Sequence, residues 1–242
     1  MAITLYELAQ ADGTRYSPYC WRVRWSLRHK GLDFRSVAIG FDDLQKLPGG
    51  SRSVPTVEID GRVVNESWRI AEVLDETFPD RPSLFACEQA KGATRFVESF
   101  FDKVVNSSLL PLFAREIHDR MAVRDQAYFR RTREQMLKRT LEEAQAGRDE
   151  DVLRFRTAIH PIRLTLKTQP WLSGETPGYA DYIGLASFQW ARLSSDFKIL
   201  VDDDSVADWV DRGLDLFEGF GRNVGARPQI DATFLPETSS SG

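Results

Sequence analysis

The hydrophobic pattern of the chain changes near residue 80, and this change limits the folds that the chain can adopt. Before that point, short runs of β-branched and aromatic residues alternate with helical segments and with turns that contain glycine or proline. After it, long stretches rich in Glu, Arg, Gln and Ala carry apolar residues at helical spacing. We therefore predict an α/β domain with a mixed sheet, followed by an all-α domain.

Three segments of the first eighty residues have the composition of β-strands. Residues 3–8 and 34–39 mix β-branched and aromatic residues, as buried strands do. Residues 55–64 contain the pair Asp60-Gly61 at their centre, and such a pair is a strong signal for a β-hairpin. Two short strands are therefore expected within this third segment.

Two helices are expected among these strands. Ser17 is a favoured N-cap residue and Pro18 a favoured first helical residue, while the glycine of Lys30-Gly31 ends the helix. The second helix follows residues 65–67 and stops before Pro79. The order of elements in this half is strand, helix, strand, hairpin and helix.

The second half is predicted to be helical throughout. Its helical stretches cover residues 88–147, 149–169, 181–193 and 205–220. The predicted domains are residues 1–80 and 87–227, and residues 228–242 are expected to form a flexible tail. The resulting cleft between two domains is a common place for a ligand site.

Charge and hydropathy argue against two classes of partner. The formal net charge is −4 and the basic residues are scattered, so a nucleic-acid surface is not expected. No run approaches the roughly 20 apolar residues that cross a bilayer, and the N-terminus has no basic leader. The chain is therefore expected to work away from membranes.

The cysteines and histidines point to a reducing compartment and to no metal site. Cys20 and Cys87 are the only two cysteines, and they lie far apart without a disulfide framework. This usage favours the cytoplasm. The histidines at positions 29, 118 and 160 are isolated from one another and from cysteine, so no metal is expected.

Ser17 stands where a helix N-terminus favours an anion. The first amide groups of a helix lack partners, and the helix dipole is positive there. A hydroxyl that donates to a thiolate contributes about 1.5–3 kcal/mol, and the dipole adds about 0.3–1 kcal/mol. Because about 1.4 kcal/mol corresponds to one pKa unit, a thiol with a pKa near 8.5 would titrate at about 6–7. Such a site activates a sulfur nucleophile.

Two further segments suit a bound peptide. In Ser53-Val54-Pro55-Thr56, proline holds Val54 extended. A cis bond before Pro55 would leave the backbone of Val54 able to pair with a peptide as an added strand does. At Glu66-Ser67, an acid, a hydroxyl and the free amides of a helix start suit the ammonium and carboxylate of an amino acid.

These segments, in this order, resemble the glutathione-binding half of a cytosolic glutathione transferase, with a thioredoxin-like first domain and an appended helical domain. The resemblance extends to about residue 225. It is narrower to the serine-type transferases related to bacterial glutathione-dependent β-etherases and to fungal etherase-like enzymes. The motifs that carry it are Ser17-Pro18-Tyr19-Cys20-Trp21-Arg22, Leu27-Arg28-His29-Lys30-Gly31, Asn65-Glu66-Ser67-Trp68 and Ala180-Asp181-Tyr182.

The resemblance implies glutathione as co-substrate and a role for each segment. Ser17 would contact the glutathione sulfur, Val54 before a cis Pro55 would hold the cysteinyl backbone, and Glu66 and Ser67 would hold the γ-glutamyl end. The family also implies a homodimer. It implies attack of the glutathione thiolate on hydrophobic aromatic electrophiles, with β-aryl ether cleavage of lignin-derived compounds, or mainly non-catalytic binding of aromatic and polyphenolic ligands, as alternatives.

The chain departs from the family pattern at two places. The family often has Ser, Thr or Asn three residues before the acid of a second-domain helix, and here that position is Gly178, a weaker cap before Asp181. The usual basic residue near the cis proline, which would bind the glycine carboxylate, is displaced. Arg52 is the first candidate for that role and Lys46 the second.

Some residues have simpler explanations. Ser17 could be only a helix cap, and Tyr6 is a rival hydroxyl donor that core packing explains better. Cys20 could indicate redox chemistry, but Ser-Pro-Tyr-Cys lacks the leading cysteine of a CxxC motif, so we expect Cys20 to be buried and inert. An aromatic-binding pocket between the domains could be faced by some of four residues, Phe100, Phe101, Phe113 and Trp190.

Overall fold

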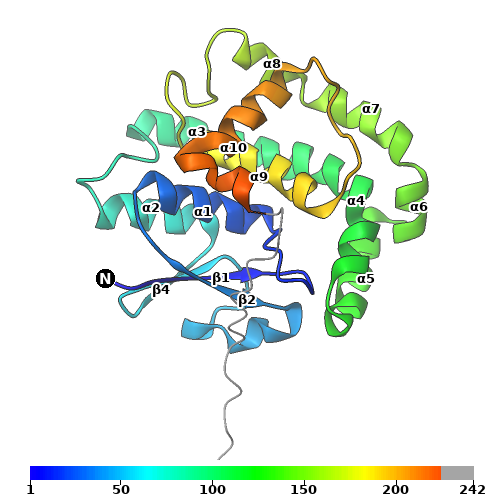
Figure 1. Cartoon of the computed structure of the whole chain (residues 1–242), viewed down its shortest axis with the longest axis horizontal. Helices are drawn as coiled ribbons and strands as arrows, with labels where there is room; N and C mark the ends of the chain where they lie inside the picture. Colours follow the sequence, from blue (N-terminus) through cyan, green and yellow to red (C-terminus); the bar gives the residue numbers. More distant parts are fainter. Residues whose placement is uncertain (225–242) are drawn as a thin grey trace, which may run out of the picture.

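The first half of the chain forms a mixed four-stranded sheet (Figure 1). In the computed structural model, which describes residues 1–224, its strands lie in the order β2-β1-β3-β4. β1 and β2 are parallel, whereas β1–β3 and β3–β4 are antiparallel, so the predicted mixed sheet is confirmed. The strands are β1 (Ile3–Leu8), β2 (Arg35–Ile39), β3 (Thr56–Ile59) and β4 (Arg62–Asn65).

The predicted hairpin joins β3 to β4. Asp60 and Gly61 have φ angles of 45° and 88°, and two positive φ angles in a two-residue loop are typical of a type I′ turn. The first of these angles is tolerated by Asp, and the second suits Gly. The sequence therefore predicted both the place and the chemistry of this turn.

Helices cover the two faces of the sheet differently. α1 (Pro18–His29) connects the parallel strands and lies with α2 (Ser67–Thr77) on one face, while the turns η1 (Phe41–Lys46) and η2 (Pro48–Gly50) lie on the other (Figure 1). A small apolar cluster beneath those turns consists of Tyr6, Val37, Ile39 and Leu47. The main core lies on the α1 side and continues into the second half.

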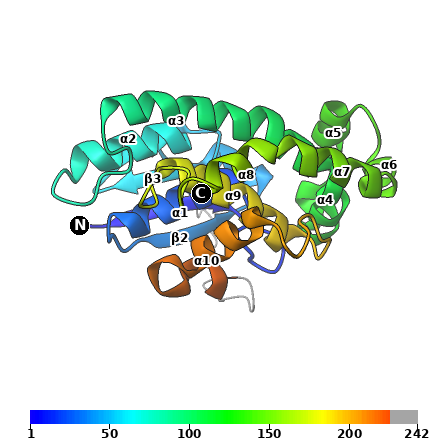
Figure 2. The same ribbon diagram turned by 90° about the horizontal axis from the view of Figure 1, so that it is seen from above.

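The helical half packs onto α1. α9 lies against α1, while α2 and α3 flank α1 on one side and α10 on the other (Figure 2). Trp21 and Trp25 of α1 are completely buried there. The helices are α3 (Glu88–Phe100), α4 (Asn106–Arg120), α5 (Val123–Leu137), α6 (Leu141–Ala146), α7 (Arg148–Ala158), α8 (His160–Leu166), α9 (Tyr179–Ser194) and α10 (Ser205–Asn223), with a π-helical turn η3 (Phe101–Val105) between α3 and α4.

The predicted stretch 88–147 is not one helix. α5 ends at Lys138, whose φ of 58° is left-handed, and Thr140 begins α6. The Thr140 hydroxyl accepts a hydrogen bond from the Glu143 amide at 3.1 Å, and the Glu143 carboxylate accepts one from the Thr140 amide at 2.8 Å. This reciprocal cap has a sequence signature, Thr-x-x-Glu, which marks the start of a new helix.

The predicted helix 205–220 is interrupted. Between Leu216 and Gly219 the backbone of α10 leaves the helical region, and three of these residues have positive φ. The interruption redirects the end of α10 onto α1, where Phe220 packs 5.9 Å from Trp21. Gly221 fits closely there, because a Cβ at that position would lie 3.0 Å from the Trp25 ring.

The connection between the halves is tied to the first domain. Asp75 accepts hydrogen bonds from the Leu84 amide at 3.0 Å and the Ser83 hydroxyl at 2.9 Å, and it pairs with the buried Lys30 at 2.5 Å. His29 donates to the Ser83 carbonyl at 3.0 Å. The domain limits 1–80 and 87–227 stay a prediction, and the expected tail 228–242 lies outside the described residues.

Asp181 organises the start of α9. Its buried carboxylate accepts four hydrogen bonds, from the amides of Leu172, Ser173 and Gly178 and from the Trp209 indole, at 2.7–3.1 Å. Gly178 supplies no capping hydroxyl, and a Cβ there would meet the Ser173 hydroxyl at 2.8 Å. The cap is therefore provided from inside the helix by Asp181.

We predict that Asp181→Ala lowers the free energy of unfolding by about 3–5 kcal/mol, because it leaves several buried donors without an acceptor. Urea unfolding at pH 7 measures this change. The matched control is Asp203→Ala, which removes an exposed carboxylate in the turn before α10 and is expected to change stability by less than about 0.5 kcal/mol. Equal stability losses in the two variants would contradict the assignment.

Candidate functional site

The strand register brings the three predicted segments to one edge of the sheet. Thr56 lies opposite Tyr6 of β1 and opposite Asn65 of β4. The segment that precedes Thr56 and the segment that follows Asn65 therefore share the edge at which β1 ends. The loop after β1 returns to that edge and delivers Ser17 at the start of α1. Ser17, Val54-Pro55 and Glu66-Ser67 thus come from three connections at the same end of the sheet.

Ser17 is buried at the N-terminus of α1, but its side chain makes no capping hydrogen bond. Its backbone is extended, and its carbonyl accepts the Trp21 amide at 3.1 Å. The first helical turn contains no acidic side chain. Its amides, like those at any helix start, lack partners within the helix, so this end of α1 favours an anion. The Ser17 hydroxyl therefore does not cap the helix.

Cys20 cannot serve as the reactive sulfur. It is completely buried, and this burial raises the pKa of its thiol to about 12, although the Ser17 hydroxyl beside it acts in the opposite direction. A thiol in this state is almost entirely protonated at neutral pH. The expectation that Cys20 is buried is confirmed, and its inertness stays a prediction.

Tyr6 belongs to the other face of the sheet. Its ring lies in the small cluster with Val37, Ile39 and Leu47, away from α1. Its hydroxyl donates to the Glu58 carboxylate at 3.3 Å, and burial raises its pKa. Core packing therefore accounts for Tyr6.

The Val54–Pro55 peptide bond is cis. The loop before it is held by the Thr56 and Ser51 hydroxyls, which donate to the Ser53 carbonyl at 2.8 Å and 3.1 Å. Within residues 1–224, the backbone of Val54 has no hydrogen-bond partner. Its amide and carbonyl are therefore available to an extended ligand.

Glu66 adopts an unusual backbone conformation at the start of α2. Its φ of 67° and ψ of 126° lie outside the ordinary regions for a residue with a side chain. Such conformations cost about 1–3 kcal/mol and cluster at functional sites. The turn leaves the Glu66 carboxylate exposed and the Ser67 hydroxyl buried next to the Tyr179 hydroxyl.

The two basic candidates occupy different settings. Arg52 is exposed in the loop two residues before Val54. Lys46 is exposed on η1 and forms an ion pair with Asp43 at 3.0 Å, and Asp43 also binds Arg124 of α5 at 2.6 Å. The charge of Lys46 is therefore partly neutralised where it lies.

Sequence reasoning missed a buried ion cluster beside these segments. Arg22 of α1 is completely buried and pairs with Asp102 of η3 at 2.5 Å and with Glu98 of α3 at 3.6 Å. Its guanidinium lies 4.7 Å from the Tyr19 ring, and the same three charges act on Tyr179 beside Ser67. The sequence does show Arg22 between two buried apolar residues. Its acidic partners could not be identified, however, because they lie some eighty positions away.

The aromatic residues proposed for a pocket are mostly core residues. Phe101 and Phe113 are almost completely buried, and Trp190 packs edge-on against Phe113 at 4.8 Å. Phe100 is partly buried and packs against the main core. Phe101 and Phe113 are therefore core residues, and the expectation that some of the four residues face a pocket stays a prediction.

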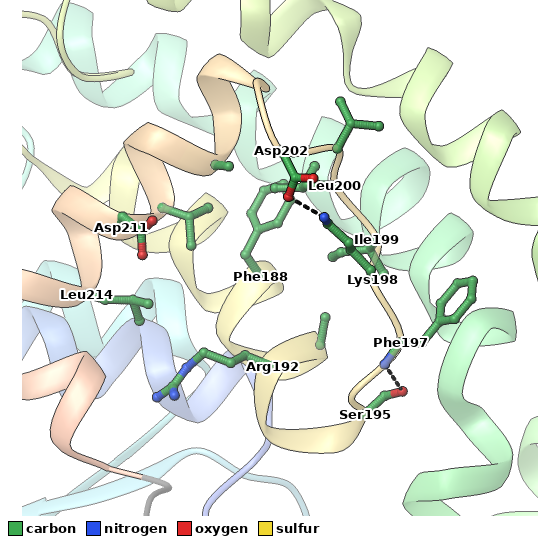
Figure 3. A pocket seen from close by; sticks show the side chains of 14 residues that line it. Phe188, Arg192, Ser195, Phe197, Lys198, Ile199, Leu200, Asp202, Asp211 and Leu214 are labelled. Atoms are coloured by element: carbon green, nitrogen blue, oxygen red, sulfur yellow. Dashed lines mark hydrogen bonds and ion pairs between the residues drawn. The ribbon is translucent and has the colours of Figure 1, made fainter.

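A cavity of about 420 Å³ lies elsewhere, between α9, α10 and the segment that joins them (Figure 3). None of its lining residues belongs to the first domain. Its charged side chains are all engaged: Lys198 with Asp202, Asp211 with Arg222, and Arg192 with the carbonyls of Gly221 and Val224. The cavity therefore offers apolar surface without an unpaired charge and is separate from Ser17.

In the part of the chain that the structure describes, no group of three or more His, Cys, Asp or Glu side chains could hold a metal ion. Among the same residues, no helix is long and apolar enough to cross a membrane.

Comparison with known families matches both halves of the chain. Residues 16–77 match the family described as glutathione S-transferase, N-terminal domain, and residues 93–212 match glutathione S-transferase, C-terminal domain. Among curated proteins, a maleylacetoacetate isomerase of Dictyostelium discoideum is 30% identical over 102 residues, and glutathione transferase GST 23 of Zea mays is 31% identical over 102 residues. These alignments cover 38% and 40% of this chain and 44% and 46% of those proteins, so the chain spans less than half of their length.

Solved structures share the fold over nearly the whole described chain. A glutathione S-transferase of Ceriporiopsis subvermispora, crystallised with glutathione, has a TM-score of 0.75 at 21% identity and covers 88% of this chain and 96% of its own. Glutathione transferase GSTFuA3 of Phanerochaete chrysosporium has a TM-score of 0.72 at 25% identity, with 90% and 92% coverage. The sheet and the helical half are therefore arranged as in these transferases.

We predict that thiol labelling separates the two cysteines. With Ellman's reagent at pH 8, the exposed Cys87 should react at once, and the buried Cys20 only after denaturation, because its pKa of about 12 leaves about one thiolate in ten thousand. Cys87→Ser should abolish the fast phase. Two equally fast thiols in the folded protein would contradict the burial of Cys20.

Proposed function

The chain belongs to the glutathione S-transferase family, and on this basis we propose that it binds glutathione with the sulfur at Ser17 and transfers it to aromatic electrophiles. One observation carries the assignment of Ser17: its hydroxyl lies at the start of α1 and makes no capping bond there. The hydroxyl and the first-turn amides can therefore be directed at an incoming sulfur.

The other segments support the proposed pose of the tripeptide. The unpaired backbone of Val54, before cis Pro55, suits the cysteinyl residue as a strand partner does. The exposed Glu66 carboxylate and the start of α2 at Ser67 suit the ammonium and carboxylate of the γ-glutamyl end. Arg52, in the loop beside Val54, is preferred to the paired Lys46 for the glycine carboxylate.

The reaction follows from the charge at the sulfur. Ser17 donates a hydrogen bond to the thiolate, and the helix start stabilises the same negative charge. The thiolate then forms a carbon–sulfur bond, and the leaving group departs with the electron pair of the bond that breaks. With an aryl ether as acceptor, the departing group is a phenolate, so release of free phenol distinguishes β-ether cleavage from substitution. Tight aromatic binding without turnover would indicate the binding role instead.

The cytoplasm is the proposed place of action. Both cysteines are free in the structure, and Cys87 is exposed. Free thiols are kept reduced in that compartment, and glutathione is abundant where it maintains the reducing state.

Ser17→Ala is predicted to lower kcat/KM about 10- to 100-fold at pH 6.5, because the lost hydrogen bond raises the pKa of the bound thiol by one to two units, roughly. The glutathione KM should stay within about threefold. The measurement is a pH–rate profile with a chloronitrobenzene acceptor, which should shift to higher pH.

The matched control is Ser26→Ala. Ser26 is a buried serine of the same helix, and its hydroxyl donates to the Arg22 carbonyl at 2.7 Å. This variant should keep the profile of the unsubstituted protein. An unchanged profile in Ser17→Ala would remove Ser17 from the mechanism.

A homodimer is proposed through the outer face of α3, which runs along one long edge of the molecule (Figure 2). Phe96 is 76% exposed there, and Val104 of η3, two turns further along the same direction, is 38% exposed. Large apolar side chains left exposed on an outer helix are candidates for an interaction surface.

Phe96→Asp is predicted to shift the protein to monomers in sedimentation velocity, since it places a charge in an apolar interface. Leu153→Asp on α7, where Leu153 is 59% exposed, is the control and should leave the dimer intact. A monomeric unsubstituted protein would refute the proposed dimer.

A further inference from the structure

Arg133 of α5 is a partly buried cation without a carboxylate. Its Nη1 donates to the Thr132 hydroxyl at 3.0 Å, and its guanidinium lies 4.8 Å from the Phe129 ring and 5.8 Å from the Phe41 ring. Within residues 1–224, no carboxylate lies within 4.0 Å of it. Removing a charge from water without a counterion is unfavourable. A partly buried guanidinium without a carboxylate is therefore a candidate for binding an anion from outside the chain.

Other arginines of α5 are paired differently. Arg124 binds Asp43 at 2.6 Å, and Arg130 binds Glu134 at 2.8 Å and Glu142 at 2.9 Å. Acids are therefore plentiful around this helix, yet none is used for Arg133. Burial lowers the pKa of Arg133 while leaving it a strong base.

The face of α5 that carries Arg133 is turned toward the first domain. Asp125, Phe129 and Arg133 are four residues apart and so share one helix face. The Asp125 carboxylate accepts the Asp42 amide at 3.1 Å, and Phe129 packs 6.3 Å from Phe41. Arg133 lies one turn beyond these contacts, on the same face.

The contacts of Arg133 place it at the sheet edge of the candidate site. Phe41, whose ring lies 5.8 Å from its guanidinium, begins η1 directly after β2. Because β2 runs parallel to β1, both strands end at the edge that carries Ser17. Tyr16 is buried, whereas Tyr19 is 39% exposed. An acceptor molecule held against Ser17 from the side of the helical domain would therefore meet aromatic rings and one guanidinium without a carboxylate partner in residues 1–224.

We infer that Arg133 recognises the carboxylate of an aromatic acceptor, so that the preferred electrophiles are anionic aromatic compounds. The inference rests on the proposed function, since it assigns the second substrate of the same site. A planar guanidinium binds a carboxylate through two parallel hydrogen bonds. The carboxylate of the ligand would thereby pair with Arg133, which has no carboxylate partner among the described residues. The rings of Phe41, Tyr19 and Tyr128 would accommodate the aromatic part of the ligand.

The test uses a pair of acceptors that differ in charge, 4-chloro-3,5-dinitrobenzoate and its methyl ester. In both, the glutathione thiolate replaces chloride at the same ring carbon. Arg133→Met is expected to lower kcat/KM for the acid about 10- to 100-fold, the effect of losing one charge-assisted pair. The value for the ester should stay within about threefold, so the acid-to-ester ratio falls.

Two variants control this measurement. Arg131 is exposed on the same helix, 5.7 Å from the Tyr128 ring, and Arg131→Met should leave the ratio unchanged. Arg133→Lys keeps the charge but loses the paired hydrogen bonds, so an intermediate ratio is expected. The lysine variant also decides the question if thermal unfolding shows that Arg133→Met does not fold.

The outcomes distinguish a failure of the Arg133 assignment from a failure of the proposed function. Ester turnover with the same acid-to-ester ratio in the unsubstituted protein and in the folded Arg133 variants would overturn the role of Arg133 alone. Absence of conjugation of both compounds by the unsubstituted protein would overturn the proposed function and this inference with it. A ratio that falls in Arg133→Met but not in Arg131→Met supports the inference.

Discussion

The burial of α1 on both sides is the constraint on which the candidate site depends. The sheet covers one side of this helix and α9 the other (Figure 1), and Trp21 and Trp25 of the helix are completely buried. α1 therefore cannot shift along its axis without breaking core contacts that interior packing makes costly. The buried pair of Arg22 with Asp102 and the α10 segment at Phe220 hold the same helix from two further directions. The position of Ser17 is thus fixed by contacts that the reactive group does not itself make.

Local chemistry predicted the elements of the first domain, and long-range contacts decided what it missed. Asp60-Gly61 specified its turn because both angles needed those residue types. The division between α5 and α6 has a local signal, the Thr-x-x-Glu cap at Thr140, which the prediction of a helical stretch over residues 88–147 did not use. The interruption of α10 at Leu216–Gly219 has a local signal in Gly219, but Phe217 and Glu218 also take positive φ there, and the redirected segment packs against α1 through Phe220. Tertiary contacts commonly override propensity in this way.

The same distinction between local signals and long-range contacts applies to the residues of the candidate site. Ser17, Val54 and Ser67 could be predicted because a helix start or an X-Pro bond is visible in adjacent residues, and the register of β1, β3 and β4 then brings them to one edge. Arg22 and Tyr179 could not be predicted, because their partners come from segments about eighty or more residues distant. Arg133 could not be predicted either, because no carboxylate partner for it is present in the described residues. The ion pairing of Lys46 could not be predicted either, because nothing in the sequence around Asp43 indicates that it also binds Arg124.

Cys20 shows why a helix start alone does not activate a thiol. It lies in the first turn of α1, beside the Ser17 hydroxyl, and its pKa is nevertheless raised from 9.0 to about 12. A rise of this size corresponds to about 4 kcal/mol, whereas a helix dipole contributes about 0.3–1 kcal/mol in the other direction. The effect of desolvation on the thiol pKa therefore exceeds that of the helix dipole wherever the sulfur is fully buried. The dipole and the hydroxyl can lower the pKa of a thiol only if that thiol remains partly hydrated, as a sulfur arriving from the cleft does. The N-terminus of α1 thus does not activate the buried Cys20 thiol, but it favours the thiolate of a bound ligand.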